Sequence, residues 1–303
     1  MIRFGLCCLF VNEPVKFRTT TAASLKALPV RKRLEKLSSI CLANAVNVKA
    51  SLLVLERLKI KSFRMSSGLF PVFTHPDVGY AINELPDAVR IRDVLRDAGR
   101  FASKNDIRLS FHPDQFVVLS SPREEVVANS ARELCYHGVL AELTGAELIN
   151  IHLGGRYGCK KDAIERFRNN FGKLPESVRK KLSLENDDVS YTPSDLHGLC
   201  LELSLPMVYD VHHHRCNPDG LSIKEATELC LGTWKRLDRE PYFHISSPKE
   251  GWSGRNKKSH ADYIDPEDFP GYWRKLKGNF TLDVEAKAKE LAVEKLMAHL
   301  GKG

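Results

Sequence analysis

The sequence predicts an α/β fold: a single (β/α)₈ TIM barrel over residues 1–303, with the active site at the carboxyl ends of its strands. Eight short strand-type runs alternate with longer segments of helical periodicity, which is typical of a parallel sheet with crossover helices. Eight such units in 303 residues match the usual size of this fold, and no linker divides the chain.

The expected strands follow one another along the whole chain. They are FGLCCLF (4–10), SFRMS (62–66), IRLSFH (107–112), ELINIHL (147–153), LSLEN (182–186), PMVYDV (206–211), PYFHIS (241–246) and NFTLDVE (279–285). Apolar residues recur at steps of three and four between them, which predicts helices at 32–58, 91–105, 124–144, 161–181, 193–203 and 223–237. The segment 247–276 is rich in Gly, Pro, Lys and Trp, and we expect a long loop that ends in a short helix.

The composition narrows the class of protein. Hydrophobic residues make up 43% of the chain, which excludes global disorder. Eight cysteines without a C-x-x-C pair indicate reduced thiols of an intracellular protein, in the cytoplasm or nucleoid if the source is prokaryotic. No apolar run reaches the roughly 20 residues of a membrane span, so no membrane contact is expected. The net charge of +8 favours a polyanionic partner.

Six of the eight strands end in an imidazole or a carboxylate. In a barrel of this type the strand ends meet at one rim, so these side chains are expected to converge. They are His112, His152, Glu185, Asp210, His244 and Glu285. Burying such groups together without cations is costly, and mixed His and carboxylate ligands without thiolates suit Mn²⁺ or Zn²⁺. The sequence therefore predicts a metal centre at this rim.

Two further motifs add candidate ligands. In DVHHH, the spacing of Asp210 and His213 allows a turn at the strand end to point both side chains at one site. His212 and His214 are then expected to face elsewhere, as outer or surface groups. In HAD, alternation places His260 and Asp262 on one side of an extended segment, so the loop 247–276 is expected to fold over the metals.

In combination, these stretches resemble the UV damage endonuclease family along nearly the whole chain. The resemblance rests on FRMSSGLFP, SFHPDQFVVLSSP, IHLGGRYGCK, LSLENDD, YDVHHHRCNP and HISSP. It implies an endonuclease IV-like barrel with up to three divalent metals, usually Mn²⁺. It also implies a repair enzyme that nicks double-stranded DNA immediately 5′ to cyclobutane dimers and (6-4) photoproducts, some members also acting at abasic sites. No nucleotide cofactor is expected, and a monomer suffices for a lesion without symmetry.

The resemblance assigns the same rim residues as metal ligands. Carried over position by position, the ligands are His112, His152, Glu185, Asp210, His213, His244, His260 and Glu285. Three positions depart from the family pattern. Phe116 stands where HPxQY has tyrosine, Cys159 stands where an acid is usual, and Tyr242 stands where some members have a lysine, sometimes modified.

The remaining candidate residues belong to catalysis and DNA binding. Hydrolysis with bound metals is expected to leave a 3′-hydroxyl and a 5′-phosphate. Glu185 and Lys160 are the catalytic candidates, and Lys160 and Arg64 are expected to contact phosphate. Gln115 and Phe116 follow His112 closely and are expected to wedge open the helix beside the lesion. The residues expected to track the DNA backbone are Trp252, Lys257 and Lys258.

Three other functions remain open from the sequence. An abasic-site endonuclease of the endonuclease IV type has the same metals but recognises a missing base. A metal-dependent sugar isomerase or epimerase on the same barrel uses its cations to polarise a carbonyl, and the positive charge argues against it. A DNA-damage binder without turnover is the third. Nicking of irradiated and of depurinated plasmid distinguishes the first and third from a photoproduct endonuclease, and aldose turnover without nicking identifies the second.

Overall fold

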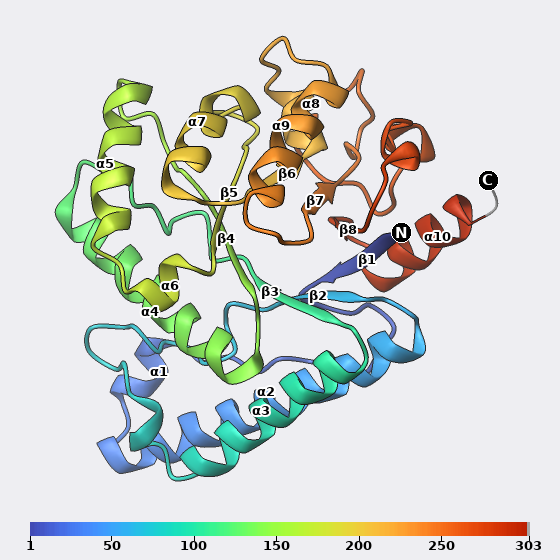
Figure 1. Cartoon of the computed structure of the whole chain (residues 1–303). Helices are drawn as coiled ribbons and strands as arrows, with labels where there is room; N and C mark the ends of the chain where they lie inside the picture. The colour runs from blue at the N-terminus through green and yellow to red at the C-terminus, as the bar shows by residue number, and fades with distance from the viewer. Residues whose placement is uncertain (302–303) are drawn as a thin grey trace.

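The computed structural model describes residues 1–301, which form a closed barrel of eight parallel strands in the order β1 to β8 (Figure 1). The strands are β1 (Ile2–Cys7), β2 (Ser62–Met65), β3 (Arg108–Phe111), β4 (Leu148–His152), β5 (Leu182–Glu185), β6 (Met207–Asp210), β7 (Tyr242–Ile245) and β8 (Phe280–Val284). Parallel pairing of β8 with β1 closes the barrel. The predicted fold class is confirmed.

The predicted helices surround the barrel. They are α2 (Val30–Arg57), α3 (Ala88–Lys104), α4 (Glu124–Thr144), α5 (Lys160–Gly172), α7 (Pro193–Leu203) and α9 (Ile223–Lys235). The helix expected over 161–181 is divided, with α5 followed by a short α6 (Glu176–Arg179). Pro175 precedes α6, and a proline cannot donate the backbone hydrogen bond that a continuous helix needs.

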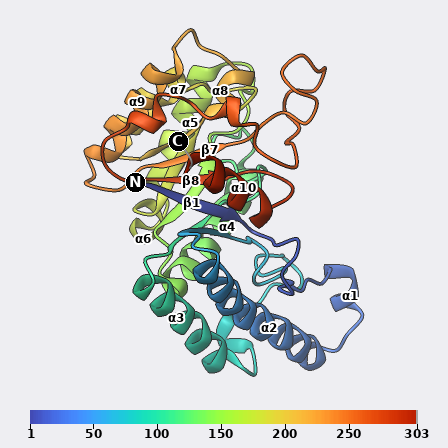
Figure 2. The ribbon, with the colours of Figure 1, turned by 90° about the vertical axis from the view of Figure 1, so that its right-hand side faces the viewer.

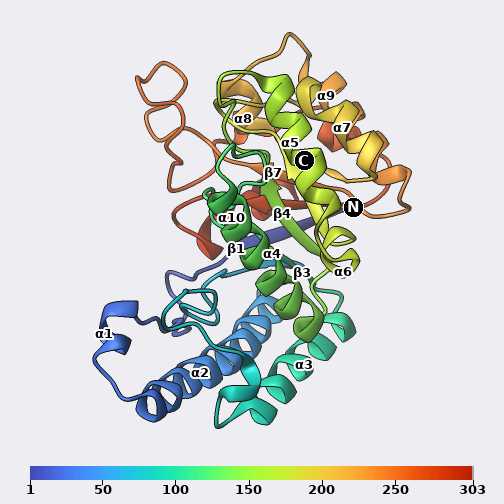
Figure 3. The same cartoon turned by 90° about the vertical axis from the view of Figure 1, so that its left-hand side faces the viewer.

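Some elements were not predicted from the sequence. These are the helices α1 (Ala22–Lys26), α8 (Val211–Cys216) and α10 (Glu290–Leu300), and the 3₁₀ turn η1 (Ile82–Glu84). By length and composition α2 could cross a membrane, but half of its most apolar window is buried in the fold. It packs beside α3 on one flank of the barrel (Figures 1 and 3). A core helix of a folded protein can have the same length and apolar composition, so α2 is weak evidence for a membrane span.

The loop after β7 projects from the end of the barrel toward which β1 runs (Figure 2). It contains the 3₁₀ turns η2 (Pro266–Asp268) and η3 (Trp273–Lys275), so the short helix expected at its end is present as a 3₁₀ turn. An isolated antiparallel bridge between Pro248 and His260 folds the first part of the loop back on itself. The loop therefore stands at the rim where the strands end.

The strands alternate between two environments. Outward residues such as Phe63, Phe111 and Tyr209 are buried among the helices, which is the main core of the protein. The alternate, inward residues include small and polar side chains such as Ser62 and Ser183. Bulky aliphatic residues usually fill the interior of this fold. Here, small and polar side chains take part of that space. This leaves room for polar chemistry below the rim.

Candidate metal centre

Six of the expected ligands lie at the carboxyl ends of six consecutive strands, β3 to β8. Strand pairing sets them side by side, because His152 is paired with Glu185 and Asp210 with His244. The six are His112, His152, Glu185, Asp210, His244 and Glu285. The rim therefore collects residues that are up to 173 positions apart, the separation of 112 from 285 in the chain.

Glu185 lies at the centre of this rim and has no exposed surface. Its Oε2 accepts a hydrogen bond from His112 Nε2 at 2.9 Å and lies 4.0 Å from His152 Nε2. Its Oε1 lies 3.1 Å from His244 Nδ1 and 3.2 Å from His213 Nδ1. One buried carboxylate thus faces four imidazoles.

Two groups of donor atoms at the rim have the spacing of metal sites, with all atoms of a group within 4.8 Å of one another. The first group is His112, His152 and Glu185, and the second is Glu185, Asp210, His244 and Glu285. Glu185 belongs to both, as a carboxylate that bridges two cations does. Within residues 1–301, these are the two groups of this spacing that the fold forms.

Several buried atoms of the second group lack a hydrogen-bond partner within the described chain. They are Glu185 Oε1, Asp210 Oδ2 and His244 Nδ1. A buried polar atom without a partner costs about 1–3 kcal/mol, so leaving all three unsatisfied would be expensive. A divalent cation is the ligand that satisfies converging oxygen and nitrogen lone pairs together, and the absence of thiolates suits Mn²⁺ or Zn²⁺. The donor set therefore fits a metal centre.

The buried carboxylate of Glu185 stabilises positive charge on its neighbours at the rim. Burial alone would favour neutral imidazole, but the carboxylate of Glu185 raises the pKa of His244 to about 9. Burial would raise the pKa of Glu185, yet His244 and His152 hold it well below its ordinary value. The carboxylate of Glu185 therefore stays ionised, and protons and metal ions compete for the same donor atoms.

His213 and His260 flank the two groups without belonging to either. His213 lies 3.6 Å from Asp210 Oδ2 and shares its Nδ1 contact with the carbonyl of Asn186 at 3.0 Å. His260 Nδ1 lies 3.7 Å from Glu285 Oε2, so the long loop does reach the rim as expected. Asp262, by contrast, is exposed and does not point inward with His260.

The other two histidines of DVHHH belong to neither donor group, as expected, and of the two alternatives, outer groups or surface groups, the surface one is wrong because both are buried. His212 has no exposed surface, and its ring lies 5.4 Å from that of His260 and 5.3 Å from that of Trp252. His214 is buried between Tyr209 and Asp219, with hydrogen bonds of 2.7 and 2.8 Å. Residues 211–216 form the helix α8, on which positions 212 and 214 lie on different sides, and each ring is covered by a separate part of the fold: His212 by the long loop, His214 by Tyr209 and Asp219.

The basic residues expected at the phosphate are engaged in ion pairs. Arg64 Nη1 donates to Glu285 Oε1, and the Arg64 side chain is only 13% exposed. Lys160 Nζ lies 2.5 Å from Asp195 Oδ2 at the start of α5. Arg64 therefore stands inside the rim beside the second ligand group, whereas Lys160 is held by a carboxylate of α7.

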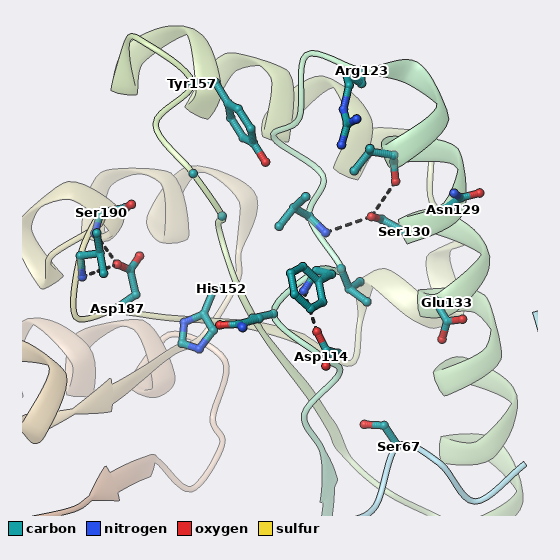
Figure 4. Close-up of a pocket in the computed structure, with 18 of the residues that line it drawn as sticks. Ser67, Asp114, Arg123, Asn129, Ser130, Glu133, His152, Tyr157, Asp187 and Ser190 are labelled. Carbon is teal, nitrogen blue, oxygen red and sulfur yellow. Dashed lines mark hydrogen bonds between the residues drawn. The ribbon is translucent and has the colours of Figure 1, made fainter. Parts of the chain in front are cut away.

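A pocket of about 1140 Å³ opens beside the first ligand group. His152 and His213 line one part of it, the β5–α7 loop at 187–190 a second, and the 114–118 segment a third. In Figure 4, His152 points into this pocket, with Asp187 on one side and Glu133 of α4 on the other. Phe116 is 77% exposed at the same pocket, so it is not packed under a loop.

The residues of the long loop have mixed surroundings. Trp252 donates to Asp268 Oδ1 at 2.6 Å and stacks loosely on Arg215, 5.6 Å from its guanidinium. Lys258 pairs with Asp188 at 3.2 Å, which links the loop to the edge of the pocket. Lys257 is exposed, and its backbone carbonyl accepts a hydrogen bond from Cys216 Sγ.

The sequence reasoning missed a buried carboxylate directly below the rim. Asp283 is 1% exposed, accepts from Ser62 Oγ at 3.2 Å and places Oδ2 3.9 Å from His244 Nε2. Gly5 is its partner across the β1–β8 pair, and a Cβ at Gly5 would lie 1.9 Å from Asp283 Oδ1. The alternation in D-V-E, two residues before Glu285 on one strand face, is the signal that could have revealed Asp283.

The departures from the family pattern also have definite places. Tyr242 is 1% exposed below the rim, and the guanidinium of Arg108 lies 4.1 Å over its ring. Cys159 is exposed at the N-cap position of α5, where its side chain makes no capping hydrogen bond. Tyr242 is therefore a packed residue of the barrel interior and does not project to the ligand groups.

Comparisons with known proteins agree with this geometry. A family profile described as UV-endonuclease UvdE matches residues 2–302. The UV DNA damage endonucleases of Bacillus mycoides (strain KBAB4) and Bacillus velezensis are each 34% identical to this chain, over 311 and 312 residues. Those matches cover 99% of this chain, 95% of the first relative and 94% of the second.

Two solved structures resemble this chain to different degrees. A crystal structure of SacUVDE superposes with a TM-score of 0.87 at 30% identity, covering 100% of this chain and 99% of that one. Endonuclease IV from Thermus thermophilus has a TM-score of 0.59 at 15% identity, covering 99% of this chain and all of that one. The second likeness shows the shared barrel alone.

Proposed function

This chain belongs to the UV-endonuclease UvdE family, and we propose that it is a metal-dependent repair endonuclease that cuts the phosphodiester immediately 5′ to UV photoproducts. The substrates are double-stranded DNA with cyclobutane dimers or (6-4) photoproducts, and the products carry a 3′-hydroxyl and a 5′-phosphate. The observation that carries the metal dependence is the convergence of two donor groups on the buried carboxylate of Glu185.

The residues that would hold divalent cations are those of the two groups. His112, His152 and Glu185 form one set, and Glu185, Asp210, His244 and Glu285 form the other. Bound there, divalent cations supply a Lewis acid for the phosphate and lower the pKa of a water molecule toward neutrality. We favour Mn²⁺ as the ion. His213 and His260 are proposed to complete the ligand set, and together the eight residues would accommodate up to three ions.

The protein's own side chains position the DNA around this centre. The guanidinium of Arg64 stands beside Glu285 and is proposed to contact phosphate, and Lys160 to do so with ammonium protons that Asp195 does not use. The exposed Lys257 is proposed to follow the DNA backbone, together with Lys258 and Trp252 after their present contacts rearrange.

Lesion recognition is proposed to rest on deformability. A photoproduct stacks poorly on its neighbours and costs less to displace from the helix than intact bases. Gln115 and Phe116 lie in the segment that follows His112, and the phenyl ring is largely exposed at the pocket. They would fill the gap in the helix, while the displaced dinucleotide enters the 1140 Å³ pocket.

The test is nicking of supercoiled plasmid with Mn²⁺. We expect UV-irradiated plasmid to be nicked in preference to untreated plasmid, with the cut mapped directly 5′ to dipyrimidines and a 3′ end that a polymerase extends. Binding without nicking in any divalent metal contradicts the proposal. Preferential nicking of depurinated plasmid identifies an abasic-site endonuclease instead.

The sugar isomerase hypothesis has no support beyond the barrel. D-psicose 3-epimerase from Clostridium cellulolyticum superposes with a TM-score of 0.53 at 12% identity, which shows the fold alone. We further propose that the enzyme acts as an intracellular monomer. Light scattering of the protein alone and on a lesion duplex checks the oligomeric state, and a dimer in both contradicts it.

A further inference from the structure

A second, smaller hollow adjoins the second ligand group on the side away from the large pocket. It has a volume of about 260 Å³ and lies between the ends of β1 and β2, the long loop and the turn that leads from β8 into α10. Its lining residues are Cys7, Arg64, Ser259, His260, Glu285, Ala286, Lys287 and Lys289. Glu285 is therefore shared between the ligand group and the hollow.

The lining is strongly biased toward positive charge. Arg64, Lys287 and Lys289 are cationic, and Glu285 is the one carboxylate among the lining residues. Within residues 1–301, neither lysine takes part in an ion pair, and the arginine side chain makes one hydrogen bond although a guanidinium has five N–H donors. Glu290, the next acid, is occupied by the amides of Val11 and Asn12.

The hollow is also held in shape by the backbone. The amide of Lys287 donates to Ala261 O and that of Ala288 to Asp262 O, both at 3.0 Å, so the long loop is fastened to the turn before α10. These bonds hold the backbone of the segment that carries the two lysines against the loop that carries His260. A fixed backbone lowers the cost of ordering the lysine side chains on a ligand.

We propose that this hollow is a subsite for a DNA backbone phosphate next to the one that is cut, bound by Arg64, Lys287 and Lys289. This rests on the proposed function. Phosphates along one strand carry a charge for about every 3.4 Å of helix axis, so a phosphate at the ligand groups has a neighbour within reach of the adjoining hollow. Three cations against one carboxylate select an anion there.

The test is the salt dependence of DNA binding by the metal-loaded protein. The probe is a fluorescent duplex with one thymine dimer, in which an uncharged methylphosphonate replaces the bond 5′ to the dimer so that it resists cutting. Binding of the wild type is compared with that of K287A/K289A over a series of KCl concentrations. The matched control is K235A/K277A, whose lysines line a different hollow, formed by α9 and the segments before β7 and β8.

We expect K287A/K289A to bind about tenfold more weakly and to reduce the magnitude of the slope of log K against log salt by about one, since one phosphate contact contributes about 0.9. The control is expected to keep the wild-type slope. K287R/K289R, which preserves charge, is expected to restore it.

An unchanged slope in K287A/K289A overturns the subsite, even if affinity falls, because loss of a phosphate contact must change counterion release. So does a slope change of equal size in the control. The plasmid assay keeps the two proposals separate. If the wild type nicks irradiated plasmid and the slope does not move, the subsite alone fails; if the wild type neither nicks nor prefers the lesion, the proposed function fails.

Discussion

The two ends of the barrel treat buried charge in opposite ways. At the amino ends of the strands, Arg108 is 8% exposed and donates five hydrogen bonds of 2.7–3.2 Å to Glu147, Glu240 and Thr281. At the carboxyl ends, Glu185 Oε1, Asp210 Oδ2 and His244 Nδ1 lie together without hydrogen-bond partners within residues 1–301. At the first end all five guanidinium donors are satisfied within the protein, whereas a bound cation would satisfy the atoms at the second end.

This contrast separates stability from function in one fold. A buried ion pair with all its donors used fixes the barrel closure, and removing a partner from it is destabilising. At the rim, ligand atoms without hydrogen-bond partners remain able to bind cations, and they lack the stabilisation that hydrogen bonds to other side chains would give. Changes at the two ends should therefore affect different measurements.

The largest effect is expected from Glu185→Gln at the rim. Loss of the charge shared by both donor groups removes several kcal/mol of metal and transition-state binding, so nicking of irradiated plasmid should fall by about a thousandfold or more. Glu240→Gln, at the opposite end, is the matched control and should keep nearly full activity per folded molecule. Retained nicking in the Glu185 variant would refute its role.

Arg108→Met should have the largest effect on stability. It leaves the carboxylates of Glu147 and Glu240 without their shared partner, and we expect a loss of about 2–3 kcal/mol. This loss is smaller than the roughly 3–5 kcal/mol that is typical when one partner of a fully buried ion pair is removed, because Glu147 is 38% exposed. Urea unfolding measures this loss. If nicking per folded molecule fell as well, the two ends would be coupled, contrary to the account.

The ends should also differ in their response to pH. The pKa of His244 is raised from 6.5 to about 9, so its protonated form stabilises the metal-free protein fully below 6.5, and this stabilisation is lost as pH rises through 9. Mn²⁺ needs the neutral ring, so its affinity should rise over that window by about tenfold per pH unit for each proton released. Isothermal titration in buffers of different ionisation enthalpy measures the Mn²⁺ affinity and the number of protons released. An affinity that does not change with pH would contradict this prediction.

Gly5→Ala should disturb the layer that joins the two ends. Its Cβ would meet Asp283 Oδ1 at 1.9 Å, and overpacking of this kind costs about 1–3 kcal/mol. Since Asp283 faces His244, Mn²⁺ affinity should fall as well. Gly172→Ala, where a Cβ meets nothing within 4 Å, is the control for the glycine change itself. Removing the clash with Gly5→Ala/Asp283→Ala should recover stability, and no recovery would place the strain elsewhere.

The smallest expected effect is that of Phe116→Ala. The ring is 77% exposed, so unfolding stability should not change, while affinity for a lesion duplex over undamaged duplex should fall about tenfold, the worth of one aromatic stacking contact. Competition anisotropy measures that ratio. Val189→Ala, which removes another exposed apolar side chain of the same pocket, should leave it unchanged. An equal loss for both duplexes would show a general binding role.

The strand ends were predictable from the sequence because one rule, the meeting of parallel strands at a common rim, applies to each strand separately. His112 and Glu285 needed no knowledge of their neighbours. Two contacts could not be predicted from the sequence: Asp283 with Gly5 and Lys258 with Asp188. Each joins residues far apart in the chain, and a local sequence pattern does not indicate such a contact. His212 and His214 lie outside both donor groups as expected, but their burial could not be predicted, because it depends on the helix α8 that follows β6 and on the segments that pack against it.

The most direct test of the account is anomalous diffraction at the manganese edge from crystals grown with Mn²⁺. We predict peaks at both donor groups, each within bonding distance of a carboxylate oxygen of Glu185, and none at Arg108. A map without a peak within bonding distance of Glu185, at Mn²⁺ concentrations that support nicking, would contradict it.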